Sequence, residues 1–329
     1  MAGAAGARPG MSANGRAALL HAIAAETRRS VGAEATALSD ALRARHGGTV
    51  VATLFYGSCL RPPTADAIGP GGADERLYDF YLLVDDLRAA NGGGLRALGN
   101  RLLPPNVYFL QTPFGPGTVR CKYAVLTLGQ FAEGCSTRTF HNYFWGRFAQ
   151  PAAVPFARDE DTRAAIDTAL AEAAATLIGR AAPLFDAPFT PAELWTRAFA
   201  ESYRCELRPE SPDRAGQIYR ADAARYDAIA ADALLAAGLP AIESNGRLMP
   251  VFDRRARRHW ALRRIAGKSF NVLRLVKAST TVADGIDYIL WKIERHSGVK
   301  TTLSAWQRRH PLLAAPGLAW KLYRQGAFR

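Results

Sequence analysis

A glycine–serine pair and a carboxylate are the residues of this sequence best suited to phosphate and metal chemistry. Gly57 and Ser58 follow an uncharged β-branched and aromatic run at 50–56, and Asp79 interrupts a second apolar run. Glycine permits a tight turn whose backbone N–H groups can face an anion. Because an unpaired carboxylate is expensive to bury, we expect Asp79 to meet a metal ion or a cation. A phosphate-binding turn beside such a carboxylate is what nucleotidyl transfer needs.

Each of these features also has a structural interpretation, which the sequence leaves open. Gly57-Ser58 could form an ordinary turn, and Asp85 and Asp86 could be the solvated end of a strand or a helix cap. Asp79 is harder to explain in this way, since it lies inside an apolar run.

The spacing of the acids poses a geometric difficulty. Asp85 shares a strand face with Asp79 by alternation, but six residues place the two roughly 20 Å apart on a straight strand. The residue two positions after Asp79 is Tyr81 rather than a second acid. Asp79 and Asp85 can share a metal only if the strand bends, and another carboxylate could complete the site instead.

The elements that position these residues are predicted from hydrophobic period, turn residues and helix caps. We predict an α+β fold with a mixed sheet surrounded by helices, followed by a helical domain. The predicted strands are at 50–56, 77–86, 106–111 and 118–127. The predicted helices lie within 17–46 and at 159–177 and 213–237, with another beginning at Thr190-Pro191. The predicted domains are 1–155 with the sheet, 156–253 with the helices, and a basic amphipathic segment at 254–329.

Charge is concentrated at the C-terminal end of the 329 residues. From Arg254 onward there are 17 lysines and arginines against three acids, a net charge of +14, whereas the whole chain carries +13. Such asymmetry indicates an anionic partner, either membrane lipid or nucleic acid. The four cysteines show no paired spacing and the six histidines form no ligand cluster, which argues against zinc and disulfides.

The C-terminal segment combines this charge with apolar and aromatic side chains. No apolar stretch reaches the roughly 20 residues needed to span a bilayer. Cationic residues beside tryptophans suit an anionic membrane interface, although the apolar stripe could pack on the helical domain instead. The stripe consists of Val282, Ile286, Ile289, Leu290 and Ile293, and the tryptophans are Trp291, Trp306 and Trp320.

Several short motifs, in a shared order and spacing, give the chain a family resemblance. They lie at 56–58, 79–86, 106–109, 122–125, 143–148 and 201–208. In these segments the sequence resembles the mitochondrial phosphatidate cytidylyltransferases of the translocator-assembly-and-maintenance type and their bacterial relatives. The resemblance implies a nucleotidyltransferase-like fold and transfer of CMP from CTP to phosphatidate, which gives CDP-diacylglycerol and pyrophosphate.

The resemblance also implies roles for individual residues. Asp79 and Lys122 would be catalytic, and Mg²⁺ would be bound by Asp79 with Asp85 or Asp86. The nucleotide would be bound by Tyr56, Gly57, Ser58, Lys122 and Arg147, and the substrate by Tyr203, Arg204 and Arg208. A surface role for Lys122 or Arg147 stays open. The expected location is cytoplasmic and peripheral on the inner membrane face, or on the matrix face of a mitochondrion, with no nucleic-acid partner.

Two departures from the family pattern put the acceptor in question. Gly57-Ser58-Cys59 stands where the family has Gly-Ser-Gly, and the segment 87–91 lacks the family's Pro-x-x-Trp-His. The alternatives are therefore a nucleotidyltransferase acting on another lipid phosphate or a small molecule, and a non-catalytic nucleic-acid-binding protein that uses the basic tail.

Overall fold

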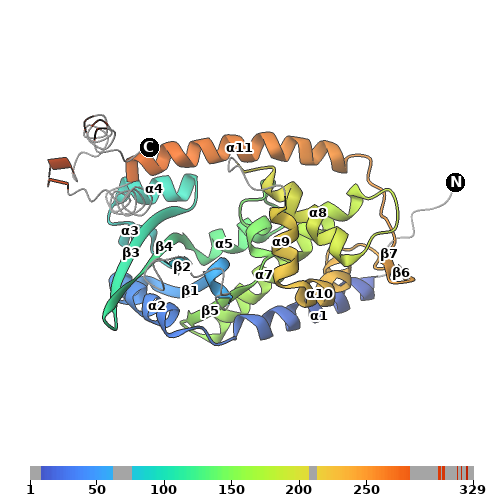
Figure 1. Ribbon diagram of the computed structural model, residues 1–329, viewed down its shortest axis with the longest axis horizontal. Coiled ribbons are helices and arrows are strands. Elements are labelled where there is room, and N and C mark those ends of the chain that lie inside the picture. The colour runs from blue at the N-terminus through green and yellow to red at the C-terminus, as the bar shows by residue number, and fades with distance from the viewer. Residues whose placement is uncertain are drawn as a thin grey trace. The chain divides into compact units, whose positions relative to one another are not determined.

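The computed structural model describes residues 9–61, 76–206 and 213–281, with a few isolated residues beyond them. It confirms the α+β fold, with a mixed five-stranded sheet and many helices (Figure 1). The chain divides into two compact units, one made of Met1–Val31 with Thr127–Val272 and one made of Gly32–Leu126 with Leu273–Arg329. The predicted boundaries at 155 and 253 stay predictions, because they follow chain order whereas these units follow proximity in space.

The second unit contains four strands whose order in the sheet is β3-β4-β2-β1. All four predicted strands are confirmed, with small changes at their ends. Strands β1 and β2 pair antiparallel, with Tyr56 opposite Asp79 at one end and Val50 opposite Val84 at the other. Strands β3 and β4 form an antiparallel hairpin. The bounds are β1 (Val50–Tyr56), β2 (Leu77–Val84), β3 (Asn106–Phe114) and β4 (Gly117–Thr127).

Three helices accompany these strands: α2 (Ala33–His46), α3 (Leu87–Asn91) and α4 (Gly94–Leu102). Helix α2 buries Leu38 and Leu42, and its Ser39 hydroxyl lies 2.8 Å from that of Thr53 on β1. Apolar burial and a satisfied buried hydroxyl pair together fix this helix against the sheet.

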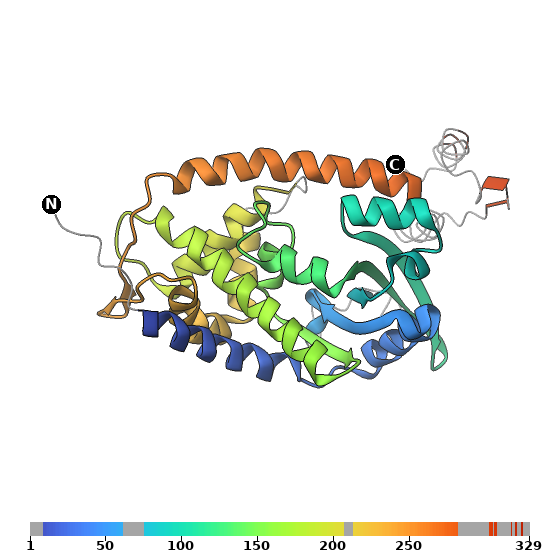
Figure 2. The same cartoon turned by 180° about the vertical axis from the view of Figure 1, so that it is seen from behind.

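The first unit is mainly helical, and α7 runs through its core (Figure 2). Most buried residues of α7 are alanine, leucine or isoleucine, so neighbouring helices pack closely against it. The bounds are α1 (Pro9–Thr27), α5 (Leu128–Cys135), α6 (Trp145–Phe148), β5 (Ala152–Ala157), α7 (Glu160–Ala181), α8 (Pro191–Tyr203), α9 (Arg214–Ala221), α10 (Ala223–Ala236), β6 (Glu243–Ser244) and β7 (Arg247–Leu248). Helix α11 (Ala256–Thr281) begins in this unit, and its residues from Leu273 on are assigned to the second.

The helix predictions for this unit are confirmed in part. Thr190 caps α8 through a reciprocal capping box with Glu193, as the sequence predicts. The predicted single helix at 213–237 is wrong, because the chain breaks into α9 and α10 at Asp222. Strand β5 escapes prediction because it is short and contains Pro155. Within the described residues, no helix is both long and apolar enough to cross a membrane.

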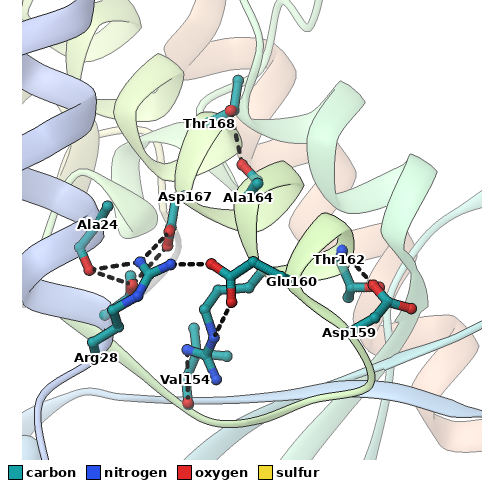
Figure 3. A network of polar contacts seen from close by, with 11 residues as sticks. Ala24, Arg28, Val154, Asp159, Glu160, Thr162, Ala164, Asp167 and Thr168 are labelled. Carbon is teal, nitrogen blue, oxygen red and sulfur yellow. Dashed lines mark hydrogen bonds and ion pairs between the residues drawn. The ribbon is translucent and has the colours of Figure 1, made fainter.

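A polar network joins α1 to α7 inside this unit (Figure 3). Arg28 lies between two carboxylates of α7, with its NH1 atom 3.0 Å from Oδ2 of Asp167 and its NH2 atom paired with Glu160. The Thr27 hydroxyl donates to Oδ1 of Asp167 at 2.6 Å. The Asp167 side chain is 3% exposed and that of Glu160 is 71% exposed. Arg28 therefore forms ion pairs with one buried and one solvent-exposed carboxylate.

Because Asp167 is buried and Glu160 is exposed, alanine variants at the two positions can be compared directly. Asp167→Ala should lower the free energy of unfolding by about 2–3 kcal/mol, because it leaves Arg28 and Thr27 without their buried acceptor. Glu160→Ala should cost less than about 1 kcal/mol, since solvent screens an exposed ion pair. Denaturant unfolding of both variants checks this, and equal losses would contradict the assignment of Asp167 as the stabilising partner.

Candidate nucleotide-binding site

The turn after β1 and the carboxylate of β2 lie in contact. Gly57 follows Tyr56, the residue opposite Asp79, and a Cβ atom placed on Gly57 would lie 2.9 Å from Oδ2 of Asp79. Gly57 also has φ 87° and ψ −166°, a conformation that is essentially restricted to glycine. Both its backbone and its neighbour therefore require glycine at this position. The structure brings together the two features that the sequence singles out.

Asp79 also meets the cation that its burial requires. Lys122 Nζ on β4 lies 2.9 Å from Oδ1 of Asp79, and the two side chains are 33% and 20% exposed. Oδ1 itself is buried, and among the described residues it accepts no hydrogen bond of good geometry. The contact with Lys122 is therefore an ion pair rather than a directed hydrogen bond. The carboxylate keeps lone pairs available for a further ligand.

The residues around this pair supply another cation. Ser58 begins a short 3₁₀ turn in which the Leu60 N–H donates to the Gly57 carbonyl at 3.1 Å. Burial raises the pKa of the Cys59 thiol, while the nearby charge of Arg76 opposes that rise. A neutral, half-buried Cys59 is a poor nucleophile. Arg76 is a site residue that sequence reasoning missed, and its only sequence signal is a basic residue three positions before Asp79.

Asp85 and Asp86 lie elsewhere. Both are exposed, and they follow the end of β2 opposite to Asp79. Oδ1 of Asp86 accepts from the N–H groups of Arg88 and Ala89 at 2.7 and 3.2 Å and thereby caps α3. The structure does not bring these two acids to Asp79. Its described ranges contain no group of three or more His, Cys, Asp or Glu side chains arranged to hold a metal ion.

A Mg²⁺ site at Asp79 would therefore rest on one protein carboxylate. Magnesium is commonly bound by one or two carboxylates together with substrate phosphates and water, rather than by an all-protein cage. The Asp79 carboxylate, whose Oδ1 pairs with Lys122, still has lone pairs for such an ion. The residues present fit a Mg²⁺ ion that arrives with a triphosphate.

The remaining predicted site residues belong to the first unit. The Arg147 guanidinium lies 4.6 Å from the Tyr143 ring centre, with its NH2 atom 3.7 Å from Oε1 of Glu206. Burial raises the pKa of the Tyr203 hydroxyl. Arg208 lies outside the described residues.

Arg204 is part of an arginine cluster around one buried acid. The Glu201 side chain is 1% exposed, and its carboxylate lies 2.8 Å from Arg204, 3.2 Å from Arg197 and 3.0 Å from Arg264. Three arginines thus pair with one carboxylate, which leaves this cluster with an excess of positive charge. The sequence shows Arg204 but gives no sign that Glu201 gathers arginines from two helices.

Comparison with known proteins adds no identification. No protein-family model matches this sequence, and no curated protein matches it significantly. The family resemblance therefore stays a prediction.

A pair of glycine variants tests the geometry of the turn. Gly57→Ala and Gly47→Ala place a side chain on similar strained backbone, at φ 87° and φ 58°, but the new Cβ has no neighbour within 4 Å at Gly47. Each should cost about 1–3 kcal/mol of stability. Gly57→Ala alone should also weaken binding of a magnesium nucleoside triphosphate by about tenfold or more, because it displaces the Asp79 carboxylate. Equal binding by both variants, measured by calorimetry, would refute this assignment.

Proposed function

We propose that this protein is a Mg²⁺-dependent nucleotidyltransferase that transfers CMP from CTP to phosphatidate. The observation that carries the proposal is the Asp79 carboxylate, held between the glycine turn at Gly57 and the ammonium of Lys122. This arrangement supports the proposal because it combines a glycine turn, a carboxylate that could bind a metal ion and a lysine paired with that carboxylate. The family resemblance supplies the identities of CTP and phosphatidate.

For this reaction the protein has to bind both substrates and neutralise the negative charge of their phosphates. A phosphate oxygen of the acceptor forms a bond to the α-phosphorus of CTP, and the bond from that phosphorus to pyrophosphate breaks. The acceptor oxygen is already anionic, so no general base is needed. Gly57 and Ser58 would bind the terminal phosphates, and Lys122 and Arg76 would neutralise them. Bound Mg²⁺, held by Asp79, would supply further positive charge at the triphosphate.

The arginine cluster of the first unit supports an anionic acceptor. Arg197, Arg204 and Arg264 surround the buried Glu201, and guanidinium groups suit phosphate because they present planar, paired donors. The resemblance assigns Tyr203 and Arg204 to acceptor binding, and the positive charge of this cluster is compatible with an anionic group.

Helix α11 supports a membrane location. No acidic residue lies between Asp253 and Asp284 in the sequence, and the basic residues of this helix accompany exposed apolar ones. A basic helix with an exposed apolar stripe is typical of membrane interfaces. The predicted repeat at 282–293 lies outside the described residues. The exposed apolar side chains of α11 are Leu262, Ile265, Val272 and Leu273.

The direct test is an incubation with α-labelled CTP, Mg²⁺ and a panel of lipid and soluble phosphates. Asp79→Asn should reduce CMP transfer by orders of magnitude, because an amide oxygen lacks the charge that the metal requires. Asp40→Asn, at an exposed carboxylate of α2, is the matched control and should retain activity. Full activity of Asp79→Asn would refute the site, and transfer to a different phosphate would replace phosphatidate as the acceptor.

Substitution of Lys122 should change the KM values of the two substrates to different extents. Lys122→Ala should raise KM for CTP more than KM for the lipid, because it removes a cation from the triphosphate side. Lys122→Arg, which keeps the charge, should lose less. If the change were confined to KM for the lipid, Lys122 would belong to the acceptor site instead.

A further inference from the structure

Helix α4 exposes its apolar side chains and buries a polar one. Leu95, Leu98 and Leu102 are 87%, 50% and 75% exposed, whereas Asn100 is fully buried. Their spacing places the three leucines along one side of the helix, and we call them the leucine surface. In a helix that only covers a soluble core, leucine faces inward and polar residues face solvent. The reversed arrangement indicates that the leucine surface has another partner.

Directed hydrogen bonds hold α4 in this orientation. The Asn100 amide donates to the Val125 carbonyl on β4 at 2.8 Å, and the Asn106 amide donates to the Arg96 carbonyl at 3.0 Å. Just after the helix, the ammonium of Lys277 donates to the carbonyl of Pro105 at 2.8 Å. Rotating α4 to bury its leucines would leave the Asn100 and Val125 groups without partners, which is costly inside a protein. The leucines are therefore held outward.

The charged residues of α4 are all basic. They are Arg96 and Arg101, and Arg88 on α3 is also exposed, whereas the exposed Asp85 and Asp86 precede α3 and Asp86 caps it. From residue 87 to residue 132 the sequence has no acidic residue. Apolar side chains flanked by arginines complement a bilayer with anionic headgroups, where each basic residue adds to binding. A symmetric contact between two copies of this face would instead bring like charges together, which is unfavourable.

We propose that the leucine surface of α4 inserts into the interface of an anionic lipid bilayer, with Arg88 and Arg101 at the lipid phosphates. It adds a membrane contact in the unit that holds Asp79, separate from the C-terminal segment. The purpose of this contact, access to a lipid acceptor, rests on the proposed function, but the contact itself needs no nucleotide.

The test is flotation of the full chain with vesicles of phosphatidylcholine, alone or mixed with phosphatidylglycerol. A triple variant, Leu95→Gln, Leu98→Gln and Leu102→Gln, should weaken binding to the anionic vesicles by about tenfold or more. The matched control replaces two exposed apolar residues elsewhere, Val107→Gln and Ile242→Gln, and should bind as the wild type does.

A second variant keeps the test decisive if the triple variant misfolds, as judged by circular dichroism and thermal unfolding. Arg88→Glu with Arg101→Glu should weaken binding to anionic vesicles and change binding to neutral ones much less. Wild-type binding by a folded leucine variant, or by the charge-reversed variant if the leucine variant misfolds, would overturn the proposal. So would a wild-type dimer that the leucine variant dissociates while vesicle binding is unchanged.

The proposed function and the membrane contact of α4 can be refuted independently of each other. Vesicle binding that depends on the leucine surface, in a protein without CMP transfer to any phosphate, would refute only the proposed function. Transfer to a water-soluble short-chain acceptor, with vesicle binding insensitive to the leucine variant, would refute only the membrane contact of α4.

Discussion

The ion pair between Asp79 and Lys122 is the constraint on which the second unit depends. A carboxylate that is mostly buried on a central strand must be balanced by positive charge, and Lys122 provides it from the neighbouring strand. The same carboxylate excludes any side chain at Gly57, so the turn after β1 has to pass close to it. The glycine at position 57 and the lysine at position 122 are thus both matched to the Asp79 carboxylate.

Basic residues lie close to buried or partly buried acids in both units. Lys122 contacts Asp79 directly, and Arg76 acts electrostatically on the nearby Cys59. In the first unit three arginines pair with Glu201. We propose that these basic residues attract phosphate-bearing ligands.

Local signals in the sequence predict much of the fold. The strand at 50–56 and the capped start of α8 at Thr190 are confirmed because period, cap and turn residues determine them. The sequence predicts the glycine turn beside Asp79, and the antiparallel pairing of β1 with β2 supplies the register that brings them into contact.

The other features of the fold and of the candidate site depend on contacts in the folded chain that local sequence patterns do not indicate. The sequence leaves open whether Asp86 binds metal or caps a helix, and hydrogen bonds to two N–H groups show that it caps α3. The gathering of arginines by Glu201 needs α8 and α11 to meet, and the discontinuous units join segments far apart in the chain. Helix α4 is not among the predicted helices. The buried hydrogen bonds of Asn100 and Asn106 determine which of its sides faces the protein.

The most direct test of the central claim is calorimetric titration of Mg²⁺ and CTP onto the wild type, Asp79→Asn, Lys122→Ala and the double variant. The account predicts saturable binding at one site in the wild type. It also predicts a strong loss in each single variant, with a combined loss smaller than the sum because the two residues act as one pair. Absence of binding in the wild type, or equal binding in all four proteins, would contradict it.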